Sequence, residues 1–149
     1  MLKTIRRFSV FFAAIAVLSP AFAADDPIEK RHALMEDVGK AAKPMGLMLR
    51  GDSEYDWEVV LTSLNTFEGA SKHFGDLFPA GSETGNDTEA APAIWEDREG
   101  FDEALAMWRD ATQDAIAAQP QTLDTARPVL GGVFKTCKNC HDGYRIEDE

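Results

Sequence analysis

The chain has 149 residues, of which 15 are basic and 26 acidic, so that its formal charge is −11 at pH 7. Nucleic acids and anionic membranes would repel a protein this acidic, and we expect neither as a partner. The length suffices for one hydrophobic core and is too short for two domains.

Residues 1–23 have the features of a secretory signal peptide. Lys3, Arg6 and Arg7 precede an apolar run that is too short to cross a bilayer, and a small-residue cleavage site ends at Ala23. The remaining residues 24–149 keep 12 basic and all 26 acidic residues, a formal charge of −14. We therefore expect one periplasmic domain without a membrane anchor. Its acidity either attracts basic patches on partner proteins or only keeps the protein soluble.

The first predicted helix spans residues 27–50. Asp26 is a candidate N-cap, Pro27 suits a first helical turn, and Gly51 is a plausible C-terminal stop. We expect Met45 and Met48 to fill the core. The apolar residues of this helix recur at helical spacing, at Ile28, Met35, Val38, Ala42, Met45 and Leu49.

The second and third helices are predicted over residues 55–78 and 93–118. Pro79 and Gly81 end the second helix, and residues 79–93 form a loop that is long for a small bundle. The inward residues expected in these helices are Trp57, Val60, Leu64, Phe67, Phe74, Phe78, Phe101, Leu105, Trp108 and Ala115.

The fourth helix is predicted over residues 123–146, and Pro128 should bend it or mark its effective start. Its inward stripe consists of Ala126, Leu130, Val133, Cys137, Cys140 with His141, and Tyr144. Four amphipathic helices of similar length, joined by three breaks, predict an all-α fold, an antiparallel up-down-up-down four-helix bundle.

The run Cys137-Lys138-Asn139-Cys140-His141 contains the only two cysteines of the chain. On a helix these two cysteines and His141 stand at positions i, i+3 and i+4, so all three project from one face. C-x-x-C-H is the attachment motif of c-type haem, in which two thiols form thioether bonds and the imidazole binds the iron. We therefore predict one covalent haem c, held by Cys137 and Cys140, with His141 as an axial ligand.

Other interpretations of the motif have less support. A structural zinc site needs four ligands, and no second C-x-x-C or H-x-x-x-H completes one. A thioredoxin-like redox pair needs a βαβ context, which this sequence lacks. A disulfide between Cys137 and Cys140, with His141 uninvolved, remains the simplest alternative.

With this motif near its C-terminus, the chain resembles the cytochrome c′ family, the class II c-type cytochromes, which form up-down-up-down bundles. Residues 137–145, CKNCHDGYR, carry the resemblance. Three further stretches support it, namely Arg31-His32-Ala33-Leu34-Met35, Leu77-Phe78-Pro79 and Pro92-Ala93-Ile94-Trp95. The likeness covers essentially the whole exported chain.

The resemblance implies one of two kinds of iron site. In one branch of the family the iron is five-coordinate and binds NO or CO, and in the other a methionine of the first helix completes a His/Met pair. Met35 matches that position, so we expect an electron carrier with Met35 as the second axial ligand. The alternative is gas binding, with Met35 only packing. We expect His32 at the rim of the site and His73 in solvent.

The resemblance also assigns roles to two arginines and to partners. Arg31 is expected beside a haem propionate, although an ion pair in solvent is an equal alternative. Arg145 and Tyr144 should flank the proximal face, where Arg145 tunes His141. The implied partners are periplasmic redox proteins, and the family allows a homodimer through the first two helices. We do not expect an enzyme, because the surroundings of Met35 offer no acid–base group.

Overall fold

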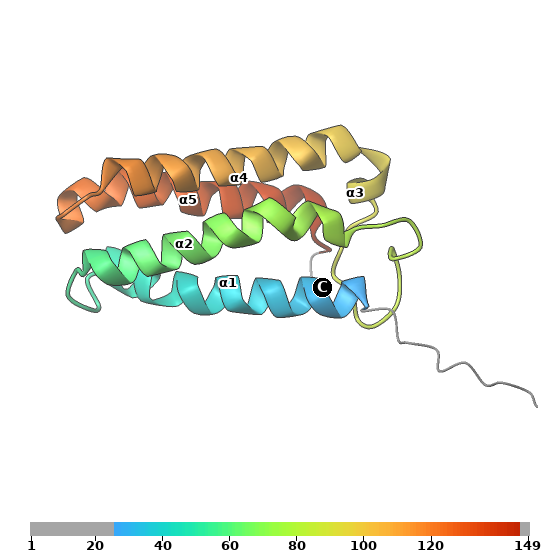
Figure 1. Cartoon of the computed structure of the whole chain (residues 1–149), viewed down its shortest axis with the longest axis horizontal. Helices are drawn as coiled ribbons and strands as arrows, with labels where there is room; N and C mark the ends of the chain where they lie inside the picture. The colour runs from blue at the N-terminus through green and yellow to red at the C-terminus, as the bar shows by residue number, and fades with distance from the viewer. Residues whose placement is uncertain (1–25, 147–149) are drawn as a thin grey trace, which may run out of the picture.

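The computed structural model describes residues 26–146, which form an antiparallel four-helix bundle (Figure 1). The proposed signal peptide lies outside these residues. The long helices are α1 (Pro27–Arg50), α2 (Trp57–His73), α4 (Arg98–Ala118) and α5 (Leu123–Tyr144). A short 3-10 helix, η1 (Phe74–Leu77), and a single helical turn, α3 (Ala93–Glu96), lie between α2 and α4. Within residues 26–146, no helix is both long enough and apolar enough to cross a bilayer.

The ends of α1 form as the sequence predicts. The Asp26 side chain accepts the backbone N–H of Ile28 at 2.8 Å, and Pro27 occupies the first turn, where a missing N–H costs nothing. Gly51 ends the helix in the left-handed region at φ 83°, and its N–H is 3.0 Å from the carbonyl oxygen of Met48.

The other helices differ from the predicted bounds at several points. The second helix changes to 3-10 geometry at Phe74, and the third is divided at Asp97. The Asp97 side chain accepts the N–H of Gly100 at 3.1 Å and thereby caps the start of α4. The last helix begins at Leu123, as predicted, directly after its N-cap Thr122. It continues through the exposed Pro128 and ends at Tyr144, two residues before the predicted end. Its start is therefore set by the cap and not by the proline.

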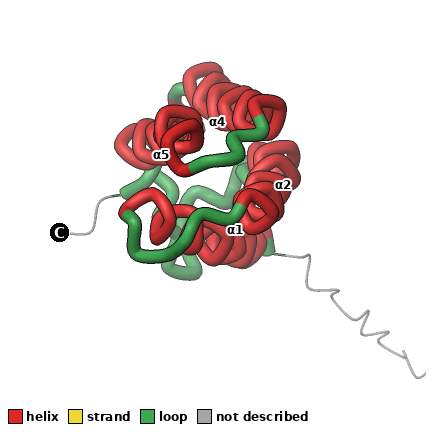
Figure 2. The backbone as a smooth tube through the Cα atoms, turned by 90° about the vertical axis from the view of Figure 1, so that its left-hand side faces the viewer, coloured by secondary structure: helices red, strands yellow, loops and turns green. Residues whose placement is uncertain are grey.

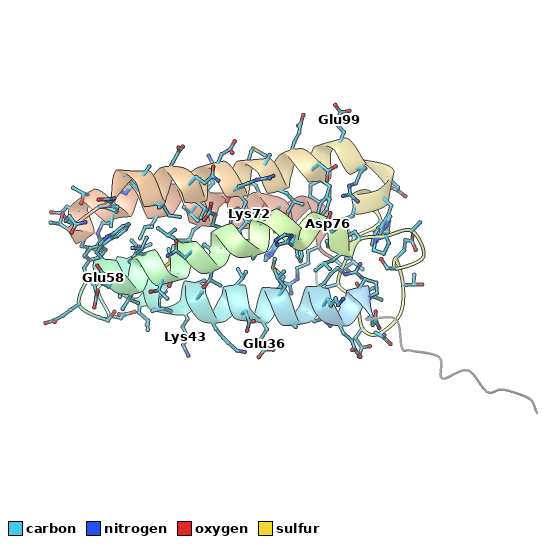
Figure 3. All side chains as sticks on the ribbon, in the orientation of Figure 1. Glu36, Lys43, Glu58, Lys72, Asp76 and Glu99 are labelled. Carbon is cyan, nitrogen blue, oxygen red and sulfur yellow. The ribbon has the colours of Figure 1, made fainter. Side chains whose placement is uncertain are left out.

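The helices pack in the order α1–α2–α4–α5 around the bundle, and α1 contacts α5 much less than it contacts α2 (Figure 2). The predicted methionines lie in the core, with Met45 fully buried and Met48 nearly so. Charged side chains such as Glu36, Lys43 and Glu99 point away from the bundle (Figure 3). The core consists mainly of Met45, Met48, Val60, Leu64, Phe67, Phe74, Phe78, Ile94, Phe101, Leu105, Trp108, Ala115, Ala126, Leu130 and Val133.

Candidate haem site

A cavity of about 420 Å³ lies between α1 and α5. Its lining includes residues of the segment 78–92, which joins η1 to α3 at one end of the bundle (Figure 1). The α1 wall includes Met35, Val38, Gly39 and Ala42, and the α5 wall includes Phe134, Cys137, Cys140 and His141. Apolar side chains of the other elements complete the lining, namely Phe74, Phe78, Ala90, Ile94, Phe101, Leu105 and Trp108. We call this space the haem cavity.

The two cysteines of the motif lie half-buried on the α5 wall, and both are free thiols. The alternative of a disulfide between them is therefore not what the structure contains. The Sγ of Cys137 lies 3.6 Å from the carbonyl oxygen of Val133, one turn earlier. Burial raises the pKa of the Cys137 thiol, and burial together with the neighbouring Cys137 raises the pKa of Cys140 to about 11. The wall thus presents two neutral thiols to an apolar space.

His141 follows on the same face of α5 and lies at the exposed edge of the haem cavity. Partial burial lowers the pKa of its imidazole, and the Arg145 cation lowers this pKa further, while Glu89 and Asp142 oppose the shift. The neutral imidazole, which is the form that binds a metal, is therefore favoured.

Met35 and His32 are the two residues of the α1 wall that carry a possible iron ligand. Met35 is half-buried, whereas His32 is exposed at the rim, as the sequence predicts. Val38, Gly39 and Ala42 extend the wall one and two turns beyond Met35, and their small or apolar side chains leave space for a flat ligand. Ligation by Met35 stays a prediction.

Arg31 is 3% exposed, so it forms no ion pair in solvent. Its Nη1 donates to the carbonyl oxygen of Leu77 (3.2 Å) and to Ser82 Oγ (3.1 Å). Its Nη2 donates to the carbonyl oxygen of Ser82 (2.9 Å) and to Thr88 Oγ1 (2.9 Å), and the guanidinium lies 4.6 Å from the ring centre of Phe78. Burial lowers the pKa of Arg31. Arg31 therefore fastens residues 78–92 to α1 beside the haem cavity, which it also lines. Contact with a propionate stays a prediction.

The same segment is fastened to the end of α5. The N–H of Ala91 donates to the carbonyl oxygen of Tyr144 (3.0 Å), and the N–H of Ile146 donates to that of Glu89 (2.8 Å). Glu89 Oε2 also lies 2.7 Å from Arg145 Nε. Glu89 is a site residue that the sequence reasoning missed, because nothing in a polar loop marks one carboxylate among several as the partner of a distant arginine.

The predicted aromatic residue Tyr144 closes the haem cavity next to His141. Its ring meets Phe101 edge-on, with centroids 5.3 Å apart, and its hydroxyl donates to Asp97 at 3.4 Å. His73 is exposed on α2, as expected, and lies outside the cavity lining. Among residues 26–146, no group of three or more His, Cys, Asp and Glu side chains is arranged to hold a metal ion, so the zinc interpretation gains no support.

Two thiols and an imidazole on one helix face, opposite an apolar wall, fit a covalently bound haem. The chemistry of this donor set inside a four-helix bundle defines the class of protein as a c-type cytochrome. Residues 26–145 match the protein family described as Cytochrome C′, and the chain belongs to this family.

Known relatives agree with this assignment. The chain is 42% identical to a cytochrome c′ of Rhodopseudomonas palustris over 139 residues, which cover 91% of this chain and 93% of the relative. It is 34% identical to a cytochrome c-556 of Agrobacterium fabrum over 150 residues, covering 98% and 97%. A solved structure of cytochrome c′ from Rhodopseudomonas palustris aligns with a TM-score of 0.80 and 38% identity, covering 83% of this chain and 98% of that one. The predictions of the bundle and of haem c are confirmed.

Proposed function

We propose that this c-type cytochrome is a periplasmic electron carrier whose haem iron is bound by His141 and Met35. The observation that carries the proposal is that Met35, half-buried on α1, lines the same cavity as Cys137, Cys140 and His141 on α5. A thioether is a competent axial ligand and raises the reduction potential of haem iron.

The bound haem would supply a one-electron couple between ferric and ferrous iron. Cys137 and Cys140 hold the group through thioether bonds, and His141 offers a neutral imidazole. Val38 and Ala42 would give the bound haem an apolar surface on the α1 side. We propose no enzymatic role, because Val38, Gly39 and Ala42 beside Met35 offer no general acid or base, and His32 is exposed at the rim of the cavity.

The alternative function is binding of NO or CO at an open iron position, with Met35 packing beside it. Its support is the 42% identity to a cytochrome c′ and the space left in the α1 wall by Gly39, which has no side chain, and by the small Ala42. The two functions differ in one property, namely whether a protein ligand occupies the second axial position.

Addition of CO to the reduced, haem-loaded protein separates the two functions. The electron-carrier proposal expects no prompt spectral shift, together with a long-wavelength methionine band in the ferric protein. Met35→Ala should then convert a low-spin spectrum into a high-spin one. Val38→Ala is the matched control, since it shortens a side chain of the same wall without removing a donor. Prompt CO binding by the unaltered protein, or an unchanged spectrum of Met35→Ala, would favour gas binding.

Several further assignments belong to this proposal. Export with cleavage after Ala23 would deliver residues 24–149 to the periplasm, where redox proteins with basic patches would be the partners of this acidic protein. Arg31 would lie near a haem propionate through its position in the lining of the cavity. Arg145 would lie on the proximal face. A homodimer through α1 and α2 is the association that the family allows.

A further inference from the structure

Glu89 and Arg145 form an ion pair at the edge of the haem cavity. Their charged atoms are 2.7 Å apart, and both residues line the cavity together with His141. The backbone of Ala90, the residue that follows Glu89, pairs with the backbone of Arg145 in an isolated antiparallel bridge. The backbone bridge and the ion pair therefore hold two opposite charges at the same edge of the cavity as His141.

These charges favour different oxidation states of a bound haem. Reduction adds one electron from an external donor to the haem, and no bond forms or breaks. The oxidised group carries one more positive charge than the reduced group, so a nearby anion stabilises the oxidised form and a nearby cation the reduced form. Glu89 should therefore lower the reduction potential, and Arg145 should raise it.

We propose that Glu89 is a positioning residue that sets the reduction potential of this cytochrome. It holds Arg145 beside His141 through the ion pair, and its carboxylate offsets the positive charge that Arg145 places there. The proposal rests on the proposed electron-carrier function for its significance, because a tuned potential serves a protein that exchanges electrons. It adds to that function a regulating residue outside the haem-binding motif.

The test is a spectroelectrochemical titration of the haem-loaded protein. Glu89→Gln removes the anion and should shift the potential upward, and Arg145→Gln removes the cation and should shift it downward. The double variant should return close to the unaltered protein. The Arg145 and Glu89 side chains are 42% and 52% exposed, which weakens each effect through solvent screening. We expect each single variant to change the ratio of reduced to oxidised protein at a fixed applied potential by roughly two- to fivefold.

Two controls separate charge from packing. Glu83→Gln makes the same change of charge on the same loop, but Glu83 is bonded to the N–H of Gly81 and lies outside the lining of the haem cavity. Its effect on the potential should be clearly smaller. Glu89→Asp keeps the charge while shortening the side chain, and it should retain the potential of the unaltered protein.

A structural role for Glu89 would give a different pattern. If loosening of residues 78–92 admitted water to the haem, both single variants would shift the potential in the same direction, and the double variant would not recover. That pattern would overturn the proposal. So would equal shifts of the potential in Glu89→Gln and Glu89→Asp, or a loss of helical circular dichroism in both of these variants. The potential can be measured whether or not Met35 binds the iron, so this test fails or succeeds separately from the CO experiment.

Discussion

Replacement of Arg31 by alanine should destabilise the protein far more than loss of an ordinary surface arginine. Arg31 is 3% exposed and donates four hydrogen bonds, of 2.9 to 3.2 Å, to Leu77, Ser82 and Thr88. In Arg31→Ala, the carbonyl oxygens of Leu77 and Ser82 lose these donors, and the contact with the Phe78 ring is lost as well.

The size of the effect follows from these contacts. Hydrogen bonds from a charged donor contribute about 1.5–3 kcal/mol each, and water entering the space recovers part of that sum. We therefore expect the free energy of unfolding to fall by about 3–5 kcal/mol, the range for breaking a buried polar network. Arg31→Lys keeps the charge but not the forked geometry, so it should recover only part of the loss.

The assay is guanidinium-induced unfolding of the haem-loaded protein, followed by far-UV circular dichroism. Arg50→Ala is the matched control on the same helix, since Arg50 is exposed and makes one ion pair with Asp52 at 2.9 Å. That control should lose less than about 1 kcal/mol. If Arg31→Ala were no less stable than Arg50→Ala, Arg31 would not be the residue that fastens residues 78–92 to α1.

Three further predictions concern the site and its support. Because burial and Arg145 lower the pKa of His141, its protonation should occur only below the ordinary histidine value of about 6.5. The optical transition that reports its loss from the iron should therefore have a midpoint under that pH, and a midpoint above it would contradict the assignment. In Gly100→Ala the new Cβ would clash first with the Asp97 carboxylate, which caps α4, and would also lie 2.6 Å from the Tyr144 hydroxyl, so thermal unfolding should show a loss of about 1–2 kcal/mol. Gly69→Ala, with open space around it, should gain up to about 1 kcal/mol. Equal behaviour of the two glycine variants would refute the close packing of Gly100 against Asp97 and Tyr144. Phe101→Ala should lower the free energy of unfolding by about 3–5 kcal/mol in chemical unfolding, since Phe101 is 1% exposed. A loss below about 1 kcal/mol would contradict the tight packing of the core around this ring.

Features that depend on neighbouring residues could be predicted from the sequence. The cap at Asp26 and the stop at Gly51 are determined within one helical turn, and both form as expected. The spacing of Cys137, Cys140 and His141 likewise places all three on one face of α5, because helical geometry alone decides it.

Features that depend on distant contacts could not be predicted. The four hydrogen bonds of Arg31 join residues 46 to 57 positions apart, and no local pattern indicates such partners. The pairing of Glu89 with Arg145 is equally remote in the chain. The break at Asp97 escaped prediction because the apolar spacing continues across it, while the aspartate caps a new helix whose direction is set by packing on α5.

We expect a haem to be held by thioether bonds from Cys137 and Cys140 on α5. The most direct measurement is the intact mass of the denatured protein, produced in a host that attaches haem in its periplasm. We expect a single species with the mass of residues 24–149 plus one haem, and a colour that survives extraction with acidified acetone. A polypeptide mass without haem, or complete loss of the pigment to the solvent, would contradict it.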